Sequence, residues 1–189
     1  MSAGAAHAPI WQHRRVSVGV VTIIAAFLAL IIVVWAAVRT VPPQQTYVVE
    51  LLGRYRRTLE PGIHLLVPFF ESVHAKVNMR EQVASFPPQP AITSDDLVAC
   101  IDTVLYYRVV DPVRATYETA NSVHAMEMLT ITTLRNLIGS MDLERARVSR
   151  NEINSRLTDV LDKNAGAWGI KVIRTEIKAI ETGSRLGCL

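Results

Sequence analysis

The chain has 189 residues, half of them hydrophobic, and its 20 lysines and arginines outnumber its 17 acidic residues to give a net charge of +3. No block of basic residues is dense enough for a nucleic-acid-binding surface, so no nucleic-acid partner is expected. The two cysteines, Cys100 and Cys188, are too few for a disulfide framework. We expect both to be unpaired thiols in a reducing compartment.

The segment from Val16 to Val38 contains no charged residue and predicts a membrane-spanning helix. At about 1.5 Å per residue, a helix of this length covers the ~30 Å hydrocarbon layer of a bilayer. The alternatives are a cleaved signal peptide, a helix buried in a soluble core, and a hairpin that enters and leaves on one side. The segment is too long for a signal peptide, is apolar on all faces and has no central proline, so a single span is favoured. Residues 1–15 are expected to be a disordered tail.

Arginines flank this segment on both sides and predict its orientation. Two precede it and four follow it: Arg14 and Arg15, then Arg39, Arg54, Arg56 and Arg57. The excess after the helix favours a cytoplasmic domain, on the inner side of what we expect to be a bacterial plasma membrane. The four later arginines are expected to face anionic lipid headgroups.

The next segment predicts an antiparallel β region. Val41 to Gln45, with two prolines, is expected to be an extended hinge. Short strands are predicted at Tyr47 to Leu51 and at Tyr55 to Leu59. The apolar run from Ile63 to Phe70 is expected either to dip into the bilayer surface or to pack on the sheet. Alternation from Val73 to Ser85 predicts one half-buried strand.

Proline-rich residues 87–90 are expected to end that strand and to mark a subdomain boundary. A long strand is predicted from Leu97 to Val110, paired on both sides. Asp111 is expected to cap a helix, and a longer helix is predicted from Ser122 to Ile138. Another begins at Ser149, where Ser149 and Glu152 form a predicted capping box.

The apolar positions of the last two helices predict their buried faces: Val123, Met126, Thr130, Leu134, Leu137 and Ile138 in the first, and Ile153, Leu157, Val160, Leu161 and Trp168 in the second. A final strand is predicted from Ile170 to Ile180, with Ile173, Thr175, Ile177 and Ala179 on one side. Helices that follow antiparallel strands indicate an α+β fold. Residues 181–189 are expected to form a short irregular tail.

Several of these segments resemble the stomatin and prohibitin-like (SPFH, Band 7) family, and most closely its bacterial slipin and paraslipin branch. They are VPPQQTYVVELLGRYRRTLEPGIHLLVPF, AITSDDLVACIDTVLYYRVVDPVRATY, TTLRNLIGSMDLERARVSRNEIN and WGIKVIRTEIKAI. The resemblance covers Val41 to Ile180. It implies an SPFH domain that assembles with copies of itself on membranes, organises lipids, and regulates membrane proteases, channels or transporters. The family's long coiled-coil helix is not evident after Ile180, which puts assembly through that helix in doubt and leaves side-by-side assembly open.

We find no catalytic, cofactor-binding or metal-binding constellation in the sequence. The histidines lack the spacing that places two metal ligands on one helix face. Asp95 and Asp96 are expected to serve a turn together with Ser94, and His124 is expected to be solvated or packed. The charged run of Glu144, Arg145, Arg147 and Arg150 is expected to be a solvated helix face, with a contact to a neighbouring protomer as the alternative.

The leading function is therefore a membrane-anchored, non-enzymatic scaffold whose partners are membrane lipid and further copies of the chain. The first alternative is an adaptor that controls a membrane protease or channel. The second is a membrane-tethered hydrolase that uses Ser94 or Cys100.

Overall fold

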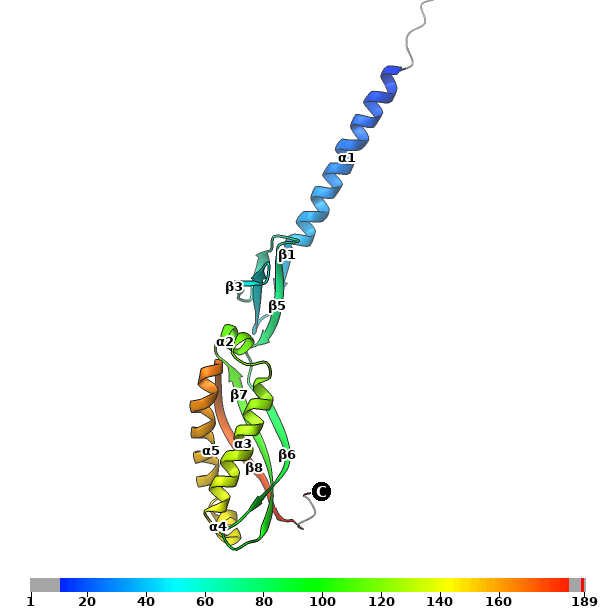
Figure 1. The fold of residues 1–189 in the computed structure, drawn as a ribbon. Coiled ribbons are helices and arrows are strands. Elements are labelled where there is room, and N and C mark those ends of the chain that lie inside the picture. Colours follow the sequence, from blue (N-terminus) through cyan, green and yellow to red (C-terminus); the bar gives the residue numbers. More distant parts are fainter. Residues whose placement is uncertain (1–10, 184–187, 189) are drawn as a thin grey trace, which may run out of the picture.

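A computed structural model describes residues 11–183 and Cys188, and shows one long helix followed by two β-containing parts in line (Figure 1). The helix, α1 (Trp11–Ala37), contains a segment, Gly19–Ala37, that is long and apolar enough to cross a membrane, with a mean hydropathy of 2.9. Because α1 begins at Trp11, residues 11–15 of the predicted tail are helical. Residues 1–10 lie outside the described part of the chain.

The smaller β part follows α1 directly and contains two sheets. β1 (Val38–Val41) pairs antiparallel with β4 (Gly62–Leu65). The second sheet has the order β3-β2-β5, formed by Arg54–Leu59, Gln45–Leu51 and Glu71–Asn78. The core of the smaller β part consists of five buried side chains: Val41, Tyr47, Val49, Leu59 and Leu66. Val73 packs against this core.

The predicted hinge from Val41 to Gln45 is wrong. Val41 pairs with Gly62 in the β1–β4 sheet, and the backbone N–H of Gln45 closes a turn by donating to Pro42 O at 3.3 Å. The two prolines fit because Pro42 follows the last residue of β1 and Pro43 lies in the turn, so neither has to donate a ladder hydrogen bond. The end of α1 is therefore joined to the sheet without a free linker.

The larger part is a three-stranded antiparallel sheet with helices packed on it. The strand order is β6-β7-β8, formed by Gln82–Ile92, Val98–Val109 and Ile170–Thr182. Between β7 and β8 the chain forms α2 (Pro112–Tyr117), α3 (Ser122–Gly139), α4 (Leu143–Val148), α5 (Arg150–Ala165) and the 3-10 helix η1 (Gly166–Trp168). α3 and α5 lie side by side on the sheet and enclose the main core (Figure 1). The observed architecture confirms the predicted α+β class.

The single strand predicted from Val73 to Ser85 is two strands in different sheets. β5 ends at Asn78 and β6 begins at Gln82, so the boundary between the two β parts lies at residues 79–81. The prolines at 87–90 are not the boundary. They lie inside β6, where its register with β7 shifts between Phe86 and Gln89. β6 is an edge strand, and an edge tolerates proline at a bulge because the missing N–H faces no partner strand.

One of the two predicted helix caps is present in the structure and the other is not. Asp111 caps α2 as predicted, because its Oδ1 accepts from the backbone N–H of Val113 at 3.0 Å and of Arg114 at 3.1 Å. The capping box of Ser149 and Glu152 is wrong: Ser149 makes no side-chain cap, and Glu152 pairs with Arg156 at 2.7 Å. Ser149 also ends α4, and its φ of −91° and ψ of 23° are not the extended conformation that a capping serine needs.

The predicted buried faces hold with local exceptions. In α3 the buried residues are Met126, Thr130, Leu134 and Ile138, whereas Val123 is exposed. In α5 they are Ile153, Leu157, Leu161 and Ala165, while Val160 is exposed and Trp168 lies in η1. β8 has a register shift opposite Tyr106 and Tyr107, and Ile173 is consequently exposed where strict alternation predicts burial. β8 also extends two residues into the predicted tail.

Candidate membrane-facing surface

One end of the smaller β part lies beside the end of α1. Val38 pairs with Leu65, and the backbone N–H of Leu66 donates to Ala37 O at 2.8 Å. The turn after β2 reaches the same end, because Leu51 pairs with Glu71 and the N–H of Leu52 donates to Phe70 O at 3.2 Å. The β2–β3 turn and the loop between β4 and β5 therefore lie next to the base of α1, where Figure 1 shows β1 beginning.

This end carries a cluster of exposed apolar side chains, which we call the apolar rim: Leu52, Leu65, Val67, Phe69 and Phe70. Phe69 is 93% exposed and Leu52 is 75% exposed, whereas Leu66, in the same loop as Phe69, is buried in the core. Phe69 and Leu52 also have positive φ angles of 72° and 51°. Large residues rarely adopt this conformation, and its cost of about 1–3 kcal/mol persists only where the surrounding structure imposes it. The fold thus holds two large apolar side chains outward at the end beside α1.

A buried carboxylate fixes the loop that bears Phe69. The Glu71 side chain is fully buried and accepts from the backbone N–H of Val67 at 2.8 Å. Arg56 Nη1 lies 2.8 Å from its Oε1, and Arg57 Nη2 lies 3.1 Å from its Oε2 and also donates to Leu65 O at 2.7 Å. The Val67 hydrogen bond, followed by the two guanidinium groups, lowers the pKa of Glu71 despite its burial. Arg56 and Arg57 are thus paired with Glu71 while nearly half of each side chain stays exposed, and their contact with lipid headgroups stays a prediction.

A cleft of about 710 Å³ runs from the end of α1 to the middle of β5. Its lining includes Ala36 and Val38 at one end, Phe69 at its side, and the cations Arg39 and Lys76. Lys76 Nζ lies 5.4 Å from the ring centroid of Tyr47, which also lines the cleft. Neither cation forms an ion pair with any residue that the structure describes.

The two β parts meet at a small polar and aromatic cluster. Tyr117 of α2 donates its hydroxyl to Glu50 Oε1 of β2 at 2.6 Å. His74 Nδ1 lies 3.3 Å from the same carboxylate oxygen, and the His74 ring stacks on Tyr117 with centroids 5.7 Å apart. Tyr55 meets Tyr117 edge-on at 6.3 Å. The Glu50 hydrogen bond is the main reason that the pKa of Tyr117 rises to about 12.

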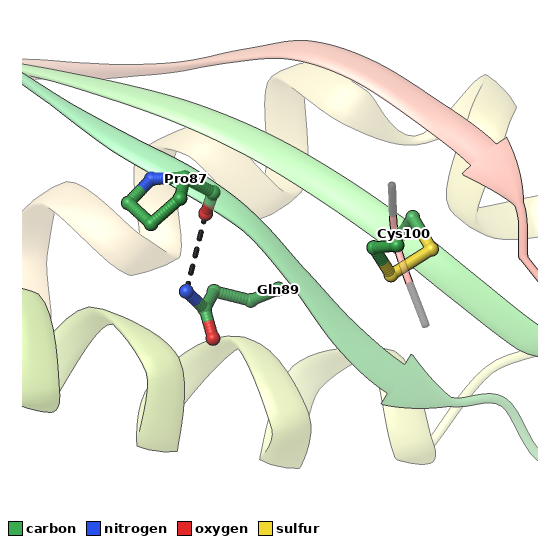
Figure 2. The surroundings of a disulfide bond; sticks show 4 residues. Pro87, Gln89 and Cys100 are labelled. Atoms are coloured by element: carbon green, nitrogen blue, oxygen red, sulfur yellow. Dashed lines mark hydrogen bonds between the residues drawn. A yellow bond between two sulfur atoms is a disulfide. The ribbon is translucent and has the colours of Figure 1, made fainter. Parts of the chain in front are cut away.

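The two cysteines form a disulfide, which overturns the prediction of unpaired thiols. Cys100 lies in β7, opposite Glu181 near the end of β8, and is bonded to Cys188. Figure 2 shows Cys100 beside β6, near the bulge where Gln89 Nε2 donates to Pro87 O at 3.2 Å. The pairing of β7 with β8 brings Cys188 close, because the chain leaves β8 beside Cys100. Because the two cysteines are 88 residues apart in the sequence, their proximity could not be predicted before the pairing of β7 with β8 was known.

The residues considered for catalysis lie in different elements: residues 94–96 in a turn, Cys100 in β7 and His124 in α3. Ser94, Asp95 and Asp96 form the turn before β7, as predicted, and Thr93 Oγ1 donates to Asp95 Oδ1, which lowers the pKa of Asp95. His124 is exposed on α3, where Nδ1 lies 3.3 Å from Glu127 Oε2. In the described ranges no group of three or more His, Cys, Asp or Glu is placed to hold a metal ion.

The charged run near α4 is largely solvent-exposed: Glu144, Arg145 and Arg147 are exposed and Arg150 is partly so. Two features of the surface beside α1, the roles of Glu71 and Lys76, were not predicted from the sequence. Glu71 belongs to no recognisable motif, since it lies between Phe70 and Ser72, and Lys76 is one of several polar residues of an alternating strand. Their roles depend on pairing with segments that are distant along the chain.

Comparison with known proteins identifies the family. The family model described as SPFH domain / Band 7 family matches residues 39–186. An uncharacterized protein of Mycobacterium tuberculosis is 46% identical over 163 residues, covering 86% of this chain and 43% of the relative. An uncharacterized protein of Methanothermobacter thermautotrophicus is 42% identical over 154 residues (82% and 48%). Stomatin-like protein 2, mitochondrial, of Rattus norvegicus is 36% identical over 146 residues (77% and 41%).

The chain thus spans less than half the length of these relatives. The matched region begins at Arg39, the second residue of β1, and extends through both β parts. Together with the stomatin-like relatives, the apolar α1 indicates association with a membrane. The chain belongs to the SPFH domain / Band 7 family.

Proposed function

We propose that this protein is a single-pass, membrane-anchored scaffold of the stomatin type, which acts by binding lipids and proteins rather than by catalysis. The observation that supports this best is the direct join of α1 to β1, which places the apolar rim beside the base of the apolar helix. An exposed aromatic side chain gains about 2 kcal/mol when its surface is removed from water, so the rim favours contact with the bilayer boundary.

The anchor is tested by placing charges at the centre of α1. Ile24→Arg with Leu28→Arg is expected to move the full chain from the carbonate-resistant membrane fraction to the soluble fraction, because each arginine costs about 2.5–3.5 kcal/mol in mid-membrane. Val83→Arg, at an exposed position of β6, is the matched control and should leave the chain in the membrane. A wild-type chain that carbonate releases would contradict the proposal.

The scaffold also requires contact between copies. The sheet face away from α3 and α5 carries charges of both signs, among them Asp102, Arg174 and Lys178, with Lys178 Nζ 3.4 Å from Asp102 Oδ2. We propose this face as the contact between neighbouring Band 7 domains. Photo-crosslinking from Ser85 in native membranes should trap dimers and larger species, and a uniformly monomeric pattern would count against assembly.

An adaptor for a membrane protease or channel is the second candidate, and it uses the same anchored domain to hold a different protein. It is separated from the lipid scaffold by purifying the crosslinked chain from native membranes. A co-purified protease or channel whose activity changes when the chain is deleted would favour the adaptor.

Two features point to opposite sides of the membrane for the Band 7 domain. The arginine count after α1 favours the cytoplasm of a bacterial cell, whereas a Cys100–Cys188 disulfide favours an oxidising compartment, because cytosolic thiols are kept reduced. Blocking free thiols in intact cells before lysis and then counting them by mass distinguishes the two. No free thiol would place the domain outside, and two free thiols would place it in the cytoplasm.

A further inference from the structure

We propose that the cleft at the base of α1 is a binding site for the headgroup of an anionic phospholipid, held by Arg39 and Lys76. This inference rests on the proposed function, because it needs α1 in a bilayer. It goes further by naming the residues, the lipid class and the place at which one lipid is held.

The position of the cleft fits a lipid of the leaflet next to the Band 7 domain. Ala36 and Val38 line it at the end of the apolar helix, and Phe69 of the apolar rim lines its side. The polar headgroup layer extends about 5–8 Å beyond the hydrocarbon on each side of a bilayer. A lipid whose acyl chains lie along α1 would therefore present its headgroup to the mouth of the cleft.

The charges of the lining favour an anion. Arg39 and Lys76 have no acidic partner in the described chain, and both project from strands that border the cleft. Glu71 is the acidic residue of the lining, but Arg56 and Arg57 already pair with it, so it does not offset the two free cations. Arginine forms bidentate hydrogen bonds with phosphate, and lysine adds a flexible point charge.

The remaining lining suits the uncharged part of a headgroup. Thr40 and Ser72 supply hydroxyl groups, while Tyr47 and Pro68 supply apolar walls. A volume of about 710 Å³ lies in the range of small-molecule sites, which hold far more than a single phosphate ion. A phospholipid headgroup with its glycerol backbone uses this space better than free phosphate does.

The test measures phosphatidylglycerol retained by the full chain in nanodiscs of phosphatidylcholine with increasing phosphatidylglycerol. Arg39→Gln with Lys76→Gln is expected to weaken the apparent affinity roughly 10- to 30-fold, because each basic residue near a membrane surface contributes substantially to anionic-lipid binding. Arg108→Gln with Lys163→Gln is the matched control, since it removes one arginine and one lysine from exposed positions of the larger part, outside the cleft. It should change the affinity by no more than about twofold.

Two results would overturn the site. An equal loss in both double variants would mean that a diffuse field, and no particular cleft, attracts the lipid. Displacement of phosphatidylglycerol by millimolar inorganic phosphate or glycerol phosphate would also overturn it. If the same phosphate binds equally well to the chain in detergent micelles without lipid, the cleft is a site for free phosphate. Either result leaves α1 in the membrane, whereas failure of the proposed function appears separately as release of the wild-type chain by carbonate.

Discussion

Glu71 holds the loop before β5 through one backbone hydrogen bond and two arginines, so its charge has a measurable structural role. Glu71→Gln keeps the shape of the side chain but removes the charge that both guanidinium groups face. We expect a loss of about 2 kcal/mol in local stability, because hydrogen bonds to charged groups contribute about 1.5–3 kcal/mol and both arginines are partly solvated. Hydrogen exchange of the amides from Leu66 to Glu71, in detergent or nanodiscs, measures it. Glu60→Gln, at an exposed position of the same β part, should leave exchange unchanged.

The same carboxylate makes the loop sensitive to acid. The pKa of Glu71 is lower in the folded chain than its ordinary value of 4.5, so folding favours the ionised form. Its contribution is complete above that ordinary value and is lost as the pH falls from there through the folded pKa. Protection of the loop amides is therefore expected to decrease as the pH falls below about 4.5 in the wild type. Glu71→Gln should abolish this step, and a step that persists in the variant would assign it to another group.

At the scale of elements, the link between η1 and β8 depends on a glycine. Gly169 has a φ of 69°, and its backbone carbonyl accepts from Val110 N at 2.9 Å and from Asp111 N at 3.0 Å. A Cβ at this position would lie 2.5 Å from Asp111 O and 2.9 Å from Arg114 Cβ. We expect Gly169→Ala to cost about 3 kcal/mol, combining left-handed strain with a clash against backbone.

Gly166 provides the control in the same segment. It has an α-helical conformation, and nothing lies within 4 Å of a Cβ built there. Gly166→Ala is expected to be neutral or to stabilise the domain by up to about 1 kcal/mol, since it restricts the unfolded chain without strain. Thermal unfolding of the two variants in the same detergent compares them. Equal destabilisation would show that neither the left-handed strain nor the contact with Asp111 sets the cost at Gly169.

Elements with a single dominant periodicity were predictable from sequence, and elements defined by distant partners were not. β7 and α3 appeared close to their true bounds because alternation or a helical stripe continues through each of them. The boundary at 79–81 was missed because β5 and β6 alternate in the same way and only their different partners separate them. The surface beside α1 was found in part: its apolar run was visible, whereas the pairing of Glu71 with Arg56 and Arg57 needs β3 and β5 in register on β2.

At the scale of the whole molecule, α2 of the larger part contacts β2 of the smaller part, and we expect this contact to restrict the angle between the two β parts. Residues 79–81 connect the parts along the chain, and the cluster of Glu50, His74, Tyr55 and Tyr117 is a second connection across the junction. The Tyr117 hydroxyl stays protonated across the neutral range because its pKa is about 12, so it continues to donate to Glu50. A scaffold that presents a larger domain at a fixed orientation to its neighbours needs such a second connection, since a single backbone link would allow free rotation.

Tyr117→Phe tests this connection while keeping the ring that stacks on His74. We expect a broader distance distribution between spin labels at Glu60 and Asp159, which are exposed on the smaller and larger parts, because the lost hydrogen bond contributes about 1 kcal/mol at a partly solvated site. Glu50→Ala, which removes the acceptor, should broaden it similarly, and the double variant should add less than the sum of the two because both remove the Tyr117–Glu50 hydrogen bond. Tyr106→Phe is the control, since the Tyr106 ring contacts Arg174 within the larger part. An unchanged distribution in Tyr117→Phe would mean that side-chain packing alone fixes the relative orientation of the two parts. The hydroxyl hydrogen bond would then make no contribution to it.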